Sequence, residues 1–312
     1  MFEKIADKAK EMVNFIGKET RVEPLFDWDI QEIPITYKTH EWIDENKTLE
    51  KHTEIEGYKA IVRSDTGNTL GVVTDRYKSF FNYQFEDLCR KIEDIPGAKL
   101  LNQGMFKDGR IVWAQYDSDL MPTENINTDG KAKDKVESKL LLTNGHAGEM
   151  SLSLIATTIR VVCQNTFIAA HRSGDAFHRI RHTKSMDKSV WEMEDTIEGL
   201  GRATSLVFDK FVQMRATEIG SEADWNKLFH DIFPRYDKSI KEDDWHARRL
   251  ATYDTVNAQY HKDISLTGET NWGLFNAITS FVDHHSNRND FSKHFGAGHQ
   301  LKMNAYKTLI KE

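Results

Sequence analysis

The sequence predicts an α+β fold, with an antiparallel β-sheet made of hairpins in the N-terminal half, backed by helices, and a helical C-terminal half. Two observations lead to this prediction. Between residues 55 and 155, runs rich in β-branched and aromatic residues alternate with tight-turn sequences, which is typical of hairpins. After residue 184, apolar residues recur at helical spacing, most clearly over residues 189–218.

The first half contains three predicted strand pairs, each joined by a short polar turn that contains glycine. They are residues 58–63 with 69–73 around Asp65-Thr-Gly-Asn68, residues 99–106 with 110–116 around Lys107-Asp-Gly109, and residues 136–144 with 150–155 around Gly145-His-Ala-Gly148. A short helix is predicted over residues 85–92 and ends at the Pro96-Gly97 turn. The polar segment 121–135 has no periodicity, so we predict a mobile loop.

We divide the chain into three regions. Residues 1–54 form an N-terminal amphipathic helix (1–18) and an extended arm, residues 55–184 a β-rich core, and residues 185–312 a helical region packed on that core. After 189–218, the predicted helices are 225–233, 244–255, 272–284 and 298–310. The apolar positions of the N-terminal helix share one face, so this helix packs either on the body of the protein or on a neighbouring subunit.

Composition limits the class of protein. The formal net charge is −7 and 39% of residues are hydrophobic, so indiscriminate polyanion binding is disfavoured. The sequence contains no run of about 18 apolar residues, which a membrane-spanning helix needs. The N-terminus lacks the apolar centre of a signal peptide. Two cysteines, Cys89 and Cys163, fit neither a disulfide framework nor a zinc site. We therefore expect a cytoplasmic protein without a membrane partner, a cofactor or a metal.

The segment Arg160-Val-Val-Cys-Gln-Asn-Thr-Phe-Ile-Ala-Ala-His171 mixes polar and apolar residues. On a helical wheel its apolar residues share a face with Ile159, whereas Arg160, Gln164 and His171 gather on an adjoining stripe. We therefore predict a helix that begins after Thr157 or Thr158. The stripe offers hydrogen-bond donors for phosphate or base edges. Alternatively, these side chains bind carbonyl groups or a carboxylate such as Asp75 inside the protein.

Positive charge concentrates around this segment. From Met150 to Lys184 there are five basic residues and one acidic residue, Asp175, with three histidines interleaved. The basic residues are Arg160, Arg172, Arg179, Arg181 and Lys184. A second cationic site is Arg76-Tyr-Lys78, where an aromatic ring lies between two cations. Cations that follow phosphates and aromatic rings that stack on bases are typical of proteins that bind single strands.

Several motifs occur in an order that resembles a known family. They are Leu70-Gly-Val-Val-Thr-Asp-Arg-Tyr-Lys78, Leu142-Thr-Asn-Gly-His146, Arg160-Val-Val-Cys-Gln-Asn-Thr166, Arg181-His-Thr183, and Trp272-Gly-Leu-Phe-Asn-Ala277 with His284. The chain resembles the phage/plasmid-like proteins of the domain-of-unknown-function family 932 over residues 55–310. Where the family more often has Ser-His-Asp-Gly, this chain has Gly145-His-Ala-Gly148. The missing aspartate weakens any mechanism that needs a carboxylate beside His146.

The resemblance implies a phage or mobile-element origin, and hence a place in the host cytoplasm. It also implies a sheet-and-helix layout similar to that of single-strand annealing proteins, which is an analogy of fold. We therefore expect a homo-oligomeric protein that binds single-stranded DNA and serves as a strand-annealing recombination factor. The residues expected to contact the strand are Arg76, Tyr77, Lys78, Arg160, Gln164, Asn165, His171, Arg172, Arg179, Arg181, His182 and Lys184.

Two other classes of function stay open, and we assign no catalytic residue. A metal-dependent nuclease or other phosphodiester hydrolase would use Asp65, Asp75, His146, His182 and the run Asp283-His284-His285, because carboxylates and imidazoles bind the metals such enzymes need. No His-Glu-x-x-His motif or phosphate-binding loop supports it. A non-enzymatic protein that antagonises a host defence would suit the acidic charge of the rest of the chain.

Overall fold

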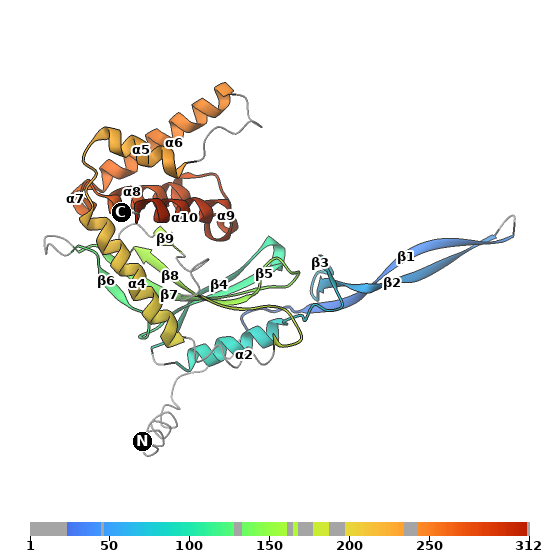
Figure 1. Ribbon diagram of the computed structural model, residues 1–312. Helices are drawn as coiled ribbons and strands as arrows, with labels where there is room; N and C mark the ends of the chain where they lie inside the picture. Colours follow the sequence, from blue (N-terminus) through green and yellow to red (C-terminus); the bar gives the residue numbers. More distant parts are fainter. Residues whose placement is uncertain are drawn as a thin grey trace, which may run out of the picture.

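The computed structural model describes residues 24–44, 47–95, 97–127, 133–160, 165–167, 177–186, 197–233 and 242–310. Within them the protein has the predicted α+β fold, with antiparallel sheets in the N-terminal half and helices in the C-terminal half (Figure 1). The described helices include none long and apolar enough to cross a membrane. The predicted N-terminal helix at residues 1–18 lies outside the described residues.

The strands form two antiparallel sheets. The smaller sheet has the order β1-β2-β3, from Ile30–Asp44, Lys47–Arg63 and Thr69–Thr74. The larger sheet has the order β10-β8-β7-β5-β4, with β6 added to β7 and β9 to β8. Its strands are β4 (Lys99–Phe106), β5 (Ile111–Asp117), β6 (Thr123–Asn125), β7 (Lys135–Gly145), β8 (Leu152–Arg160), β9 (Asn165–Phe167) and β10 (Phe177–Ile180).

Some helices pack on the larger sheet, and those nearer the C-terminus pack mainly on one another. The described helices are α2 (Asn82–Glu93), α4 (Ile197–Ala216), α5 (Glu222–Ile232), α6 (Glu242–Lys262), α7 (Ile264–Thr267), α8 (Asn271–Ser280), the π-helix η4 (Phe281–His285), α9 (Asp290–Phe295) and α10 (Ala297–Leu309). A 3₁₀ turn, η1 (Lys107–Gly109), joins β4 to β5. Helix α2 packs its apolar face, including Phe85, Leu88 and Ile92, on the sheet core.

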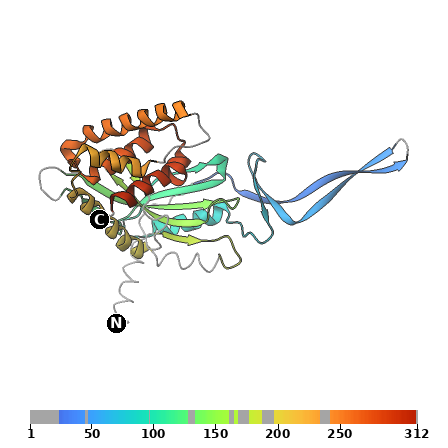
Figure 2. The same ribbon diagram turned by 45° about the horizontal axis from the view of Figure 1, so that its top comes forward.

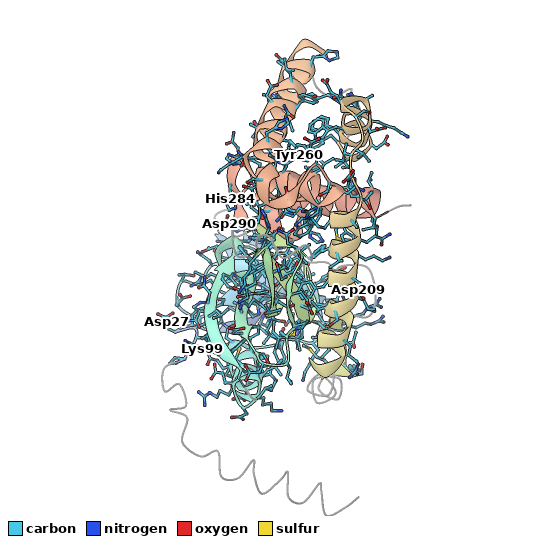
Figure 3. The ribbon with its side chains drawn as sticks, turned by 90° about the vertical axis from the view of Figure 1, so that its left-hand side faces the viewer. Asp27, Lys99, Asp209, Tyr260, His284 and Asp290 are labelled. Atoms are coloured by element: carbon cyan, nitrogen blue, oxygen red, sulfur yellow. The ribbon has the colours of Figure 1, made fainter. Side chains whose placement is uncertain are left out.

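Helix α4 connects the two hydrophobic clusters of the molecule. Leu200, near its start, belongs to the cluster formed by α2 and the larger sheet. Phe208, Phe211 and Met214, further along, belong to the cluster formed with α5, α6, α8 and α10. Figure 3 shows α4, with Asp209 labelled, running from the sheet toward the helical group around Tyr260. Burying apolar area on both layers makes this helix a structural link between them.

The structure confirms most of the predicted elements. All three strand pairs form: β2 with β3, β4 with β5, and β7 with β8. The turn at Lys107-Asp-Gly109 forms as predicted, because Lys107 and Asp108 have φ of 52° and 56° and Gly109 has φ of 93°. The predicted helices over 85–92, 225–233, 244–255 and 298–310 correspond to α2, α5, α6 and α10. Residues 272–284 form α8 and then η4.

Two predictions of local structure are wrong. Residues 123–125 in the predicted mobile loop form β6, paired to the start of β7. The predicted helix at residues 159–171 is not a helix in its described parts, because Ile159 and Arg160 end β8 and residues 165–167 form β9. Side chains on both faces of β8 are buried, so its last residues lack the alternation of apolar and polar residues by which a strand is told from a helix.

Strands β1 and β2 form a long two-stranded ribbon that projects from the body (Figures 1 and 2). We define the ribbon as residues 30–63. The sequence predicted an extended arm within residues 1–54 and a hairpin that begins at residue 58, but not the pairing of β1 with β2. This pairing was missed because residues 39–56 are mostly charged or hydroxylated, a composition that carries little hydrophobic signal for a strand.

Candidate nucleic-acid interface

The structure brings together the two cationic segments that the sequence indicated. Residues 76–78 follow β3, and residues 179–184 begin in β10, which pairs with β8. The backbone amide of Lys78 donates to the carbonyl of His182 over 3.2 Å. In return, Nδ1 of the His182 ring lies 3.0 Å from the carbonyl of Lys78. This reciprocal pair joins segments that are 104 residues apart in sequence.

Tyr77 and His182 hold this junction together. Their rings stack with centroids 4.7 Å apart and planes 17° from parallel. The hydroxyl of Tyr77 donates to the carbonyl of Gly145 over 2.8 Å, which ties the junction to the end of β7. Burial, together with the nearby Glu149, raises the pKa of Tyr77, and burial lowers the pKa of His182. Both side chains therefore stay neutral at pH 7 and position the segments.

Five basic side chains around this junction are exposed, and we call them the cationic rim. They are Arg76, Lys78, Arg179, Arg181 and Lys184. Residues 75–78 and 179–184 contain one acidic residue, Asp75, which is also exposed. Exposed guanidinium and ammonium groups on adjacent segments supply donors and positive charge suited to phosphate oxygens.

His146, the residue after Gly145, is completely buried. Its Nδ1 lies 3.3 Å from Nδ2 of the Asn144 side chain. Its ring contacts that of Trp28 edge-on, with centroids 5.8 Å apart. Burial, and to a smaller extent His182, lowers the pKa of His146 to about 3. A side chain without solvent access cannot meet a nucleic acid, so His146 belongs to the core behind the junction.

This burial predicts a pH-dependent stability. The folded-state pKa of His146, about 3, is below the unfolded value of about 6.5, so below pH 6.5 the unfolded state takes up a proton that the folded state does not. Its contribution is therefore present above about pH 6.5 and is lost as the pH falls toward about 3. Between about pH 7 and about pH 5, His146 alone should lower the free energy of unfolding by about 2 kcal/mol.

Urea unfolding at the two pH values measures this effect. His146→Gln, shown by circular dichroism to be folded at neutral pH, should lose about 2 kcal/mol less than the wild type over the same interval. His40→Gln, at an exposed site in the ribbon, is the control and should keep the wild-type dependence. A His146→Gln variant with the full wild-type pH dependence would contradict this explanation.

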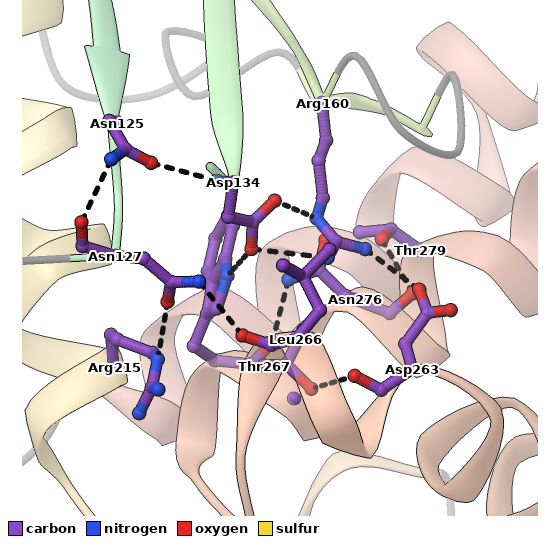
Figure 4. Close-up of polar contacts among 12 residues, drawn as sticks. Asn125, Asn127, Asp134, Arg160, Arg215, Asp263, Leu266, Thr267, Asn276 and Thr279 are labelled. Atoms are coloured by element: carbon purple, nitrogen blue, oxygen red, sulfur yellow. Dashed lines mark hydrogen bonds and ion pairs between the residues drawn. The ribbon is translucent and has the colours of Figure 1, made fainter. Parts of the chain in front are cut away.

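Arg160 occupies a different kind of site from the one predicted. Its side chain is 1% exposed and its Nε lies 2.6 Å from Oδ1 of Asp134, whose side chain is 0% exposed. Nη2 donates to Oδ2 of Asp134 over 3.1 Å, and Nη1 donates to Asp263 over 2.8 Å. Figure 4 shows this arginine between the sheet and the helical group. The expected contact between Arg160 and a nucleic acid is therefore corrected, because its guanidinium is buried on two carboxylates.

The surroundings of Arg160 join the sheet to the helical half. Trp272, at the start of α8, donates from Nε1 to Oδ2 of Asp134 over 2.8 Å. Asn127 donates to the carbonyl of Leu266 over 3.0 Å and accepts from Arg215 over 2.8 Å (Figure 4). The internal alternative considered for Arg160 thus holds, although its partners are Asp134 and Asp263 and Asp75 is exposed elsewhere.

The other predicted contact residues have no described side chain. Gln164, His171 and Arg172 lie outside the described residues. Asn165 starts β9 and pairs with Arg160 through the register of β8 and β9, but its side chain is not described. Of the predicted set, the structure therefore groups Arg76, Tyr77 and Lys78 with the segment that carries Arg179, Arg181, His182 and Lys184.

The carboxylates proposed for a hydrolase are dispersed. Asp65 binds Arg63 through both carboxylate oxygens, at 2.9 and 2.6 Å, whereas Asp75 is exposed at the end of β3. Asp283, in η4, forms a buried ion pair with Lys302 of α10. Among the residues that the structure describes, no group of three or more His, Cys, Asp or Glu could hold a metal ion.

Sequence reasoning missed two residues that organise these sites. Asp134 falls in the segment assigned to a mobile loop, yet it is completely buried. Gly145 accepts the hydroxyl of Tyr77 through its backbone, which no side-chain pattern reveals. The motif Trp272-Gly-Leu-Phe-Asn-Ala277 could have indicated that a buried acceptor such as Asp134 is present, because a buried indole needs an acceptor for its N–H.

Comparison with known proteins identifies a family. A family model described as "Domain of unknown function (DUF932)" matches residues 69–305. No curated protein and no solved structure matches the chain. The matched range contains the cationic rim, His146, and Arg160 with its partners Asp134 and Asp263, and it leaves out the ribbon.

Proposed function

The chain belongs to the DUF932 family, and we propose that it binds single-stranded DNA through the cationic rim. The observation that carries this proposal is the junction of Lys78 with His182, which sets two cationic segments side by side. Phosphate contacts supply most of the affinity of nonspecific nucleic-acid binding. A rim of exposed cations on a fixed backbone, in a protein of net charge −7, favours local binding of a phosphate chain over general adsorption.

An exposed aromatic ring that follows the rim closely in sequence favours a single strand over a duplex. Tyr83 is 58% exposed and follows Lys78 by five positions. Its ring stacks on that of Phe81 with centroids 5.6 Å apart, which limits its rotation. Bases of a single strand stack on such rings with about 1–3 kcal/mol each, largely independent of sequence. Tyr77 is unsuited to this role, because it stacks on His182.

We propose further that the protein serves strand annealing for a phage or another mobile element, as a homo-oligomer in the host cytoplasm. The support for annealing is the antiparallel sheet backed by helices, a layout that annealing proteins share. The support for the origin is the order of the motifs from Leu70 to His284, which resembles phage/plasmid-like proteins. Annealing activity is tested by the rate at which complementary strands pair in the presence of the protein.

Fluorescence anisotropy with a labelled single strand tests the binding. The wild type should bind at low salt and lose affinity steeply as salt is added, because cations on the strand are released. A variant that carries Arg76→Ala, Lys78→Ala, Arg181→Ala and Lys184→Ala should bind at least tenfold more weakly at low salt. Each lost phosphate contact should lower the slope of log affinity against log salt by about 0.7.

The matched control removes four exposed cations from the helical half: Lys210→Ala, Lys227→Ala, Lys262→Ala and Lys307→Ala. It changes the net charge equally and should bind like the wild type. If both variants lose affinity to the same degree, general charge and not the rim is responsible. Adding Mg²⁺ or Mn²⁺ to the same reaction and following strand length tests for nuclease activity.

A further inference from the structure

Exposed apolar side chains gather on the smaller sheet. Ile33 and Tyr37 on β1 are 40% and 49% exposed, Leu49 and Tyr58 on β2 are 53% and 49% exposed, and Val72 on β3 is 57% exposed. Large apolar residues scattered singly on a surface are ordinary, whereas a contiguous set marks a surface that is covered by a partner. Whether these five side chains form one contiguous surface depends on where the register of the sheet places them.

The register places the inner members of this set on one face. Ile33 lies opposite Ala60 on β2, and Ala60 lies opposite Val72 on β3. Tyr58 is two residues from Ala60, and side chains two apart in a strand point to the same face. Ile33, Tyr58 and Val72 therefore share one face at the base of the ribbon.

The same face continues along the ribbon. Tyr37 is four residues beyond Ile33 in β1, so the two side chains point the same way. The register shift between Pro34 and Thr36 leaves one residue of β1, Ile35, and four residues of β2, 55–58, without a partner in this pairing, so the extra residues lie in β2. Leu49 lies opposite Glu41, which is four residues beyond Tyr37. We call the face that carries Ile33, Tyr37, Leu49, Tyr58 and Val72 the apolar ribbon face.

In the middle of the ribbon, the described side chains of the opposite face are polar, at Thr36, Lys38, His40, Glu50 and His52. Glu50 binds both Lys38, from the neighbouring strand, and His52, whose Nε2 lies 2.9 Å from the carboxylate. His40, also exposed, lies opposite Glu50 in the register. The ribbon therefore alternates apolar and polar residues, as antiparallel strands do when one face is buried and the other is solvated.

We propose that two copies of the chain associate through the apolar ribbon face, ribbon against ribbon, about a twofold axis. The charges on the outer part of this face favour a second copy of the chain as the binding partner. Glu41 and Lys51, which lies opposite Thr39, have opposite signs on the same face. In a twofold, antiparallel arrangement the acid of one copy meets the base of the other, which makes the face self-complementary.

The area of the ribbon is compatible with an interface between two copies. A strand of 15 residues spans about 50 Å, and two strands about 5 Å apart give a footprint on the order of 500 Å² before β3 is added. A standard interface buries about 800 Å² per partner, so the ribbon and its base supply most of that area. An isolated two-stranded hairpin is only marginally stable in water, and packing on a second ribbon stabilises it.

This inference does not depend on nucleic-acid binding, and the molar mass of the full chain in solution tests it. Light scattering on the eluting protein should give about twice 36.1 kDa. The double variant Tyr37→Glu/Leu49→Glu places two carboxylates on the apolar ribbon face and should elute as a monomer. The matched control Thr36→Glu/His40→Glu places two carboxylates on the polar face of the same ribbon and should remain a dimer.

Circular dichroism shows that each variant is folded before its mass is compared. A wild type of single-chain mass at all concentrations overturns the proposal, and so does a Tyr37→Glu/Leu49→Glu variant that stays dimeric. Removing residues 1–23 should leave the dimer intact. A monomer after that truncation also overturns the proposal, because the N-terminal segment would then be the contact.

Discussion

Arg160→Met is expected to lower the free energy of unfolding by about 3–5 kcal/mol. The substitution leaves the carboxylate of Asp134 at 0% side-chain exposure without its guanidinium partner. Removing one member of a buried ion pair is costly because the remaining charge stays out of water. Asp263 contributes less to this cost, since its side chain is 30% exposed and water can solvate it.

Chemical denaturation measures this loss, and a second substitution assigns its cause. Asp134→Asn added to Arg160→Met removes the stranded charge and keeps an oxygen for the indole of Trp272, so part of the stability should return. Arg76→Met, at an exposed position, should change the stability by less than about 0.5 kcal/mol. An Arg160→Met variant as stable as the wild type but unable to bind a single strand would contradict the internal role of Arg160.

Lys302→Met is expected to have an effect of similar size, about 3–5 kcal/mol. Lys302 and Asp283 form an ion pair with side chains 1% and 6% exposed, between α10 and the π-helix η4. Burial lowers the pKa of Lys302 and the adjacent carboxylate opposes that shift. Without the ammonium group, Asp283 is left buried beside an apolar side chain, so the helical group should be destabilised.

The pair Lys293–Asp290, whose carboxylate is exposed, provides the control for Lys302. Its atoms are 3.4 Å apart and Asp290 is 75% exposed, so Lys293→Met should cost less than about 1 kcal/mol. Asp283→Asn added to Lys302→Met should restore part of the lost stability. Equal losses from Lys293→Met and Lys302→Met in urea unfolding would show that burial of the pair is unimportant.

The sequence predicted those parts of the fold that depend on local chemistry. Each predicted strand pair is joined by a turn whose residues accept unusual backbone angles, as the positive φ values at Lys107, Asp108 and Gly109 show. The amphipathic helices were equally predictable from the sequence, because one face of each is apolar over several turns. Predictions failed at residues 159–167, where apolar residues at helical spacing lie in the end of β8 and in β9, and in the ribbon, where the strands carry mostly polar residues.

The candidate site could be predicted only in part, because its geometry depends on contacts between distant residues. The cations of 76–78 and 179–184 were visible as local clusters, but their junction joins residues 104 apart. Arg160 was visible as an unusual polar residue, and its partners Asp134 and Asp263 lie 26 and 103 positions away. A single sequence contains no signal for which distant carboxylate neutralises a buried arginine.

Photo-crosslinking of the full chain to a single-stranded oligonucleotide with bromodeoxyuridine at successive positions tests the central claim most directly. Digestion and mass spectrometry then identify the peptides that carry nucleotide adducts. The cationic rim predicts adducts on peptides that contain residues 76–83 and 179–184, suppressed by added salt as phosphate contacts are released. Adducts confined to the ribbon or to α5–α10, with none on either rim peptide, would contradict the account.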